Sequence, residues 1–145
     1  PSWSRGLGDV YKRQNLFNEK QNGNSILNLK NKNLIETCHD VSLGGILTAI
    51  SKMGIKSGKG VKLFPLEGLV NKFEYFFGED QGRYIIEIKP ENLENVENML
   101  KKESIHFDKL GLVEGDKITL ENDLKLSIDD IKEDYKKWLK EYMVN

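Results

Sequence analysis

The spacing of apolar residues along this chain alternates between the period of helices and the period of strands. Apolar residues three and four positions apart predict helices with one buried face, over residues 46–53, 66–75, 93–100 and 128–142 and more weakly over 22–31. In the last helix, the residues predicted to face inward are Ile128, Ile131, Tyr135, Trp138, Leu139 and Tyr142. Short apolar runs between turn-forming residues predict strands at 34–38, 61–64, 83–88, 110–113, 117–120 and 124–126.

Two local signals support the starts of predicted helices. Pro90 suits the first position of a helix, where its missing N–H costs nothing. Ser127, followed by Asp130 three residues later, resembles a capping box. Gly-Asp and Asn-Asp pairs supply turns between the last three strands. The succession of elements predicts an α/β domain of the α+β type, with helices packed on a mixed, largely antiparallel sheet.

Composition narrows the class of protein. The chain has 145 residues, of which 38% are apolar and 31% charged, with a formal net charge of -1. Basic and acidic residues are interspersed, so the charge pattern does not predict nucleic-acid binding. No apolar run reaches the ~18–20 residues of a membrane span. The single cysteine, Cys38, excludes an intrachain disulfide and favours a reducing, cytoplasmic compartment.

The first 14 residues have a different composition from the rest of the chain. They hold two of the three arginines, whereas the later cations are otherwise all lysine. The stretch SRGLGDVYKRQ looks like a sequencing adapter translated in frame. We predict that residues 1–14 are a disordered artefact and that residues 15–145 form one domain; a genuine disordered extension is the alternative. The absence of a methionine near residue 15 favours a truncated gene.

The segment HDVSLGG, which begins at His39, lies between a predicted strand and a predicted helix. A helix N-terminus presents unpaired N–H groups and attracts anions. Gly44 and Gly45 would let a ligand or another backbone approach closely. Asp40 and Ser42 can cap the helix or contact a polar ligand. Spacing alone favours the structural interpretation, in which the side chains cap and the glycines permit tight packing.

The segment FFGEDQGRY places two carboxylates, an amide and a guanidinium close together, at Glu79, Asp80, Gln81 and Arg83. These groups can converge on a hydroxylated or phosphorylated ligand. Lysine supplies the other cations after residue 14, so the choice of arginine at position 83 indicates a need for the planar guanidinium group, which can make two parallel hydrogen bonds. The alternative is an internal salt bridge from Arg83 to Glu79 or Asp80, at the mouth of a cleft facing HDVSLGG. The residue types leave both alternatives open.

Other kinds of site are not indicated. Cys38, His39 and His106 do not have the spacing of zinc ligands. The sequence contains no G-x-x-x-x-G-K-[ST] loop for phosphates and no G-x-S-x-G nucleophile motif. We therefore expect neither a metal ligand nor a catalytic residue in this chain.

Together the two segments resemble motifs of the phosphoribosylformylglycinamidine synthase family. HDVSLGG is similar to that family's HDVSDGG, and FFGEDQGR is similar to its LFGEDQGR or LFSESQGR. The resemblance covers about residues 22–143 and implies the C-terminal domain fold of the aminoimidazole ribonucleotide synthetase superfamily. The positions that match ligand motifs are His39, Asp40, Ser42, Gly44, Gly45, Glu79, Asp80, Gln81, Gly82 and Arg83.

The resemblance also implies an activity for a longer parent enzyme. That family uses ATP and Mg²⁺ to convert formylglycinamide ribonucleotide to the amidine in purine biosynthesis, with ammonia derived from glutamine. The implied partners are the remaining domains of the parent subunit and a glutaminase subunit or domain.

Within that enzyme the resemblance points to the second C-terminal-type domain. The resemblance implies that the cleft of this domain has an auxiliary, structural role and does not carry out turnover. We therefore expect the isolated chain to be inactive and to hold no cofactor alone. Leu43 stands where the family usually has Asp, which weakens a ligand role for the first segment. The alternative functions are a non-catalytic scaffold and a small-ligand-binding domain of another superfamily member.

Overall fold

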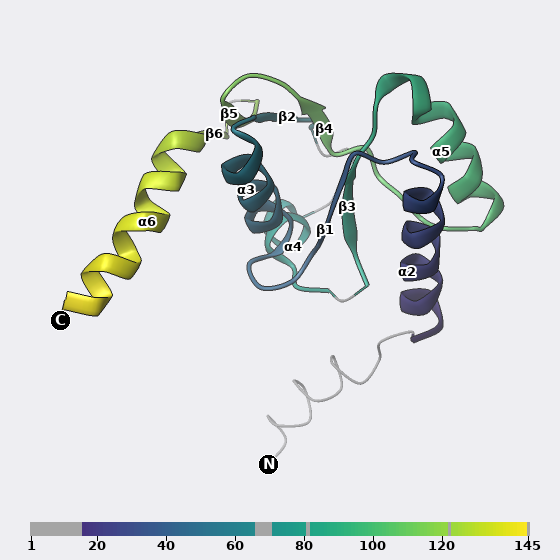
Figure 1. Ribbon diagram of the computed structural model, residues 1–145, viewed down its shortest axis with the longest axis horizontal. Helices are drawn as coiled ribbons and strands as arrows, with labels where there is room; N and C mark the ends of the chain where they lie inside the picture. Colours follow the sequence, from purple (N-terminus) through teal and green to yellow (C-terminus); the bar gives the residue numbers. More distant parts are fainter. Residues whose placement is uncertain (1–15, 66–70, 81, 122, 145) are drawn as a thin grey trace, which may run out of the picture. The chain divides into compact units, whose positions relative to one another are not determined.

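The computed structural model describes residues 16–65, 71–80, 82–121 and 123–144, and the predicted artefact at residues 1–14 lies outside them (Figure 1). The chain divides into two compact units. The first unit contains the described residues up to Ser42 together with Asp80–Phe107, and the second contains Leu43–Glu79 together with the residues from Asp108 onward. No described helix is long and apolar enough to cross a membrane.

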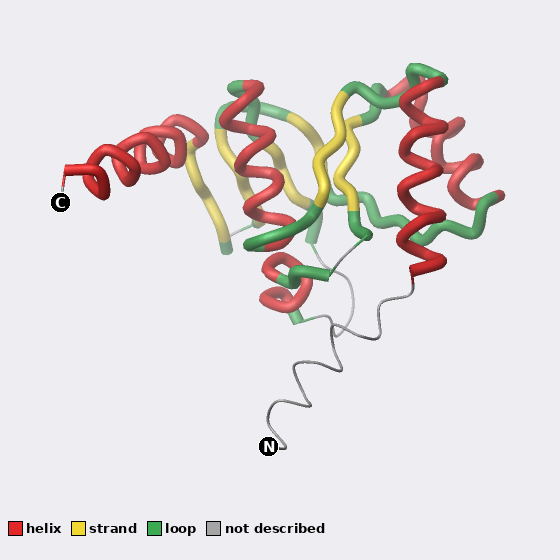
Figure 2. The backbone as a smooth tube through the Cα atoms, turned by 60° about the horizontal axis from the view of Figure 1, so that its bottom comes forward, coloured by secondary structure: helices red, strands yellow, loops and turns green. Residues whose placement is uncertain are grey.

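The first unit has two helices and a two-stranded sheet. Its elements are α2 (Leu16–Asn31), β1 (Thr37–Asp40), β3 (Tyr84–Glu87) and α5 (Pro90–Lys102). Strands β1 and β3 are antiparallel, and Asp40 pairs with Tyr84 at one end. Helices α2 and α5 lie side by side in both views of the backbone (Figures 1 and 2). Helix α5 begins at Pro90, as predicted.

The core of the first unit lies between these helices and the sheet. Leu29 of α2 and Val96 and Leu100 of α5 are buried. The partly buried residues packed against them are Leu34, Ile35, Ile86, Ile88, Met99, Ile105 and Phe107. The predicted apolar stripe of α5 is therefore confirmed, because its helical spacing places Val96 and Leu100 on one face.

The second unit contains a four-stranded sheet and three helices. Its elements are α3 (Gly45–Ser57), β2 (Val61–Leu63), α4 (Lys72–Phe77), β4 (Gly111–Val113), β5 (Lys117–Leu120), β6 (Leu124–Ser127) and α6 (Ile128–Val144). The strand order is β4-β2-β5-β6. Strand β2 pairs in parallel with β5, and the other pairs are antiparallel, so the predicted mixed sheet is confirmed.

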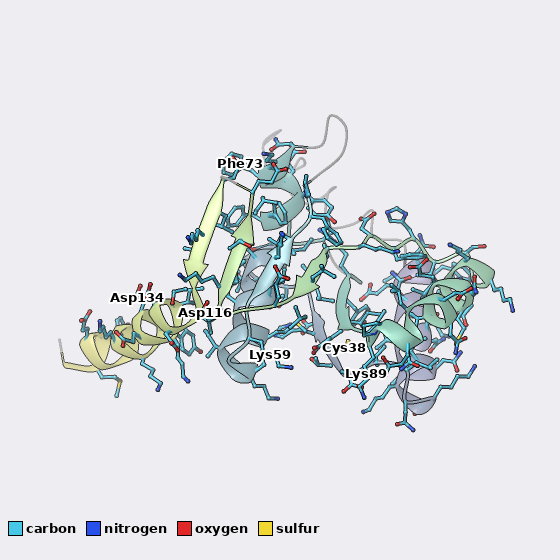
Figure 3. All side chains as sticks on the ribbon, turned by 90° about the horizontal axis from the view of Figure 1, so that it is seen from above. Cys38, Lys59, Phe73, Lys89, Asp116 and Asp134 are labelled. Atoms are coloured by element: carbon cyan, nitrogen blue, oxygen red, sulfur yellow. The ribbon has the colours of Figure 1, made fainter. Side chains whose placement is uncertain are left out.

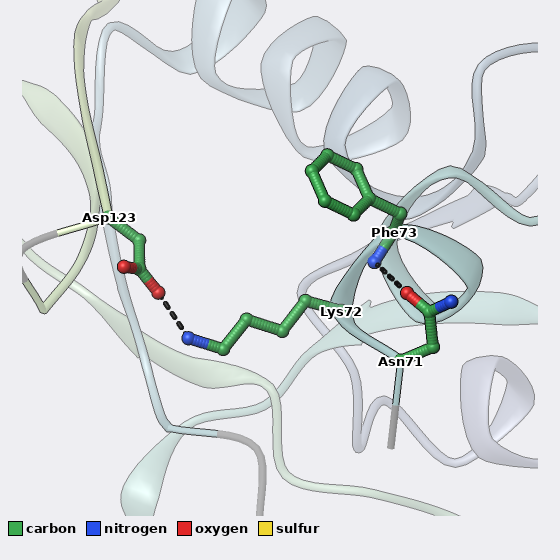
Figure 4. Close-up of polar contacts among 4 residues, drawn as sticks. All are labelled: Asn71, Lys72, Phe73 and Asp123. Atoms are coloured by element: carbon green, nitrogen blue, oxygen red, sulfur yellow. Dashed lines mark hydrogen bonds and ion pairs between the residues drawn. The ribbon is translucent and has the colours of Figure 1, made fainter. Parts of the chain in front are cut away.

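Helix α4 is held at its N-terminal end by two polar contacts (Figure 4). The side chain of Asn71 caps the helix by accepting a hydrogen bond from the N–H of Phe73, at 3.0 Å. Lys72 pairs with Asp123, which follows β5. The hydrogen bond and the charge of Asp123 raise the pKa of Lys72. The helix had been predicted over residues 66–75; residues 66–70 lie outside the described residues, and the helix continues to Phe77.

Two details differ from the predictions. Strand β1 begins at Thr37 and takes in His39 and Asp40, which had been predicted in a loop, because both pair with β3. In α6, Ile128 is buried as predicted, but Tyr135 and Tyr142 are 69% and 70% exposed, so their predicted inward orientation is wrong. Within the second unit, the described packing of α6 is against α3 and β6. The side chains of Trp138 and Leu139 lie outside the described ones, so their predicted inward orientation stays a prediction.

Candidate functional site

The double glycine of HDVSLGG lies at the start of α3, and both residues have left-handed backbones, with φ of 80° at Gly44 and 70° at Gly45. A Cβ added to Gly45 would lie 2.5 Å from the carbonyl oxygen of Phe76 and 2.7 Å from the Cα of Phe77. The start of α3 therefore packs directly against the end of α4. Within the second unit this close backbone contact explains why glycine is required at position 45.

Glu79 supplies the anion at the start of α3. Gly44 is the N-cap residue and has no side chain with which to cap. Its N–H instead donates a hydrogen bond of 2.8 Å to Oε1 of Glu79. A carboxylate is favourable there because of the unpaired N–H groups and the helix dipole. This contact joins two residues that match ligand motifs, and it gives Glu79 a structural role that the sequence did not indicate.

In the first unit, the ends of β1 and β3 bring the remaining described motif positions together. The N–H of Val41 donates a hydrogen bond of 2.9 Å to the carbonyl oxygen of Arg83. Nδ1 of His39 lies 2.6 Å from the carbonyl oxygen of Asp40. His39 thus makes a polar contact within its own strand. Ser42 is exposed, and Gln81 lies outside the described residues.

Arg83 pairs with a carboxylate of its own loop. Its Nη1 lies 3.2 Å from Oδ2 of Asp80, three residues earlier. The side chain of Arg83 is 28% exposed, whereas that of Asp80 is 77% exposed. This contact agrees with the salt-bridge alternative and identifies Asp80 as a partner. Because Asp80 is well solvated, the pair has the energetics of a surface ion pair.

Helix α2 contributes residues that sequence reasoning missed. Nδ2 of Asn22 donates a hydrogen bond of 2.9 Å to the carbonyl oxygen of Gly82. A Cβ added to Gly82, whose φ is 72°, would lie 3.2 Å from Glu19. Asn22 is 60 residues away in sequence and belongs to a helix with no motif, so no sequence signal pointed to it.

Cys38 lies on β1, where Figure 3 labels it. Partial desolvation by neighbouring protein atoms, and then the charge of Asp40, raise the pKa of its thiol even though the residue is exposed. A raised pKa makes the thiol less nucleophilic at neutral pH. Among the described residues there is no group of three or more His, Cys, Asp or Glu that could hold a metal ion. Among the described residues, the site therefore shows motif positions that contact backbone groups, and no metal cluster.

Residues 2–121 match the family described as AIR synthase related protein, C-terminal domain, and the chain belongs to that family. The matched range includes most of residues 1–14, so the foreign origin of that segment stays a prediction. The chain is 55% identical over 131 residues to the phosphoribosylformylglycinamidine synthase subunit PurL of Pelagibacter ubique. It is 37% identical over 127 residues to the protein of the same name from Bartonella bacilliformis.

These alignments cover 90% and 88% of the chain but only 18% and 17% of the two relatives. The chain thus spans less than a fifth of their length.

Solved structures share the fold. T. maritima PurL complexed with FGAR superposes with a TM-score of 0.67 at 20% identity, over 79% of this chain and 21% of that one. PurLQS from Thermotoga maritima gives a TM-score of 0.68 at 22% identity, with the same coverage. The predicted fold, the C-terminal domain type of this superfamily, is confirmed.

Proposed function

We propose that this chain is a domain of phosphoribosylformylglycinamidine synthase, which converts formylglycinamide ribonucleotide, ATP and ammonia to the amidine. The observation that carries the proposal is the 55% identity to a curated subunit over 90% of the chain. Both ligand-motif segments support it, because HDVSLGG precedes GEDQGR along the chain, as in the family. The reaction is that of an ATP-dependent carbon–nitrogen ligase in purine biosynthesis, and we place it in the cytoplasm.

Within that enzyme we propose that this domain supports the others and does not carry out turnover. ATP and Mg²⁺ are expected to bind in other domains of the parent, as the resemblance to the family implies. The N–H of Gly44 at the start of α3, where a phosphate would bind well, already donates to Glu79. Leu43 beside it is exposed and adds no carboxylate. These residues do not fit a bound nucleotide, and no chemical step is assigned to them.

Exposed apolar side chains support a role in packing against the remaining domains of the parent subunit. In the first unit α2 exposes Leu16, Phe17 and Leu27. In the second unit Phe73 and Phe77 of α4 stack with ring centroids 6.3 Å apart and remain exposed. Large apolar side chains in a patch are typical of interaction surfaces. A glutaminase subunit or domain, as the source of ammonia, is a further expected partner of the whole enzyme.

A domain exchange tests the proposal. Residues 15–145 would replace the matching 131 residues of the Pelagibacter ubique subunit, and the chimera would be assayed for amidine formation with its partner proteins. We expect activity within about tenfold of the parent, since the exchanged segments are 55% identical. A chimera that folds and assembles but makes no amidine would contradict the proposal. The parent subunit lacking those residues is the matched negative control.

A further inference from the structure

The turn at Gly82, in the GEDQGR segment, is held from one side by α2. The amide of Asn22 donates to the Gly82 carbonyl oxygen at 2.9 Å. The left-handed Gly82 also approaches Glu19 so closely that a Cβ there would lie 3.2 Å from the Glu19 Cα. Asn22 and Glu19, three residues apart, lie on one face of α2. One helical face therefore contacts the turn through both a hydrogen bond and a close approach.

The same turn is also held by Val41, the residue that follows β1. The next carbonyl along the chain, that of Arg83, accepts the N–H of Val41, which is buried. Two consecutive carbonyl groups thus have fixed partners, one on α2 and one directly after β1. Because these contacts fix the peptide planes on either side of the Arg83 Cα, they set the direction in which its side chain leaves the backbone.

We propose that Asn22 is a positioning residue, which acts through the Gly82 carbonyl to set the backbone of Arg83. An amide is suited to this because it supplies an N–H donor without a charge. A carboxylate at the same place would turn an acceptor toward the carbonyl oxygen and add a negative charge near Glu19. This role goes beyond the proposed function and holds whether or not Arg83 contacts a ligand.

Hydrogen exchange on the chain itself tests the inference. Asn22→Asp removes the donor, and Asn24→Asp, two positions along the same helix, is the matched control, since Asn24 is exposed and faces the solvent side. The reporter is the amide of Val41, which bonds to Arg83, and the internal reference is the amide of Glu36, which bonds to Glu87 beyond the opposite end of the β1–β3 pair. Each amide exchanges when the structure around it opens locally, so the two amides report separately on the two ends of the strand pair.

We expect Asn22→Asp to speed exchange at Val41 roughly tenfold, as for the loss of one hydrogen bond, and to leave Glu36 within about twofold. Asn24→Asp should change neither amide. Equal acceleration at Val41 and Glu36 would show general destabilisation and overturn the positioning role. Unchanged exchange at both would overturn it as well. Neither result would bear on the domain exchange, so failure here is distinct from failure of the proposed function.

Discussion

Gly45 and Gly58 both have left-handed backbones, with φ of 70° and 72°, but they differ in their surroundings. Alanine at either position would destabilise the folded state by about 1–2 kcal/mol, because an L-residue with a Cβ disfavours the left-handed backbone conformation. At Gly58 nothing lies within 4 Å of the new Cβ. At Gly45 the Cβ would meet backbone atoms of Phe76 and Phe77 at 2.5–2.7 Å, and a backbone cannot move aside as a side-chain end can.

Overpacking of this kind adds about 1–3 kcal/mol. Gly45→Ala should therefore reduce the free energy of unfolding by about 2–5 kcal/mol, and Gly58→Ala by about 1–2 kcal/mol. Urea unfolding followed by far-ultraviolet circular dichroism measures the difference. With a slope of about 1–3 kcal/mol per molar urea, an extra 2 kcal/mol lowers the midpoint by roughly 1 M. Gly115→Ala is a second control, because its φ is 63° and its Cβ position is also open.

Equal midpoints for the alanine variants at Gly45 and Gly58 would refute this reasoning. The contact between α3 and α4 would then tolerate a methyl group. The double glycine would no longer be explained by packing, and a ligand that approaches the backbone would become the better explanation of the motif.

Three further predictions concern the first unit. Arg83→Lys should change the free energy of unfolding by less than about 1 kcal/mol in urea denaturation, because its ion-pair partner Asp80 is 77% exposed; a loss above about 2 kcal/mol would contradict the energetics of a surface ion pair. Cys38 should react with iodoacetamide at pH 8 more slowly than free cysteine, because its pKa is raised, and Asp40→Asn should speed the reaction; a rate matching free thiol would contradict the pKa shift. Since the folded-state pKa of Cys38 lies above that of the unfolded chain, its contribution to stability should be lost as pH rises above about 9.

Local sequence patterns predicted the elements that depend on neighbouring residues. Pro90 starts α5, and Ser127 caps α6 by accepting from the N–H of Asp130. Long-range pairing was not predictable in the same way. The turn between β4 and β5 suggested neighbouring strands, yet β2 lies between them. Strands β2 and β5 are parallel and distant in the sequence, so no tight turn joins them and the turn residues do not indicate that they pair.

The contacts of the site residues were not predictable for the same reason: they join residues that are distant in the sequence. The sequence drew attention to Glu79 and Arg83 through their composition, but their partners are backbone groups and side chains set by the fold. Gly44, the partner of Glu79, is 35 residues away. Tyr135 was predicted to face inward because periodicity reports an apolar stripe without reporting how much of it is covered.

The central claim is that this domain contributes structure, and not chemistry, to an ATP-dependent ligase. The most direct test is phosphate release by the purified chain with ATP, magnesium, ammonia and formylglycinamide ribonucleotide. We predict release no faster than in buffer alone, for the chain and for Glu79→Gln and Arg83→Lys. Reproducible release above buffer that either substitution abolishes would contradict the account, because it would place working catalytic groups in the segment assigned here to packing.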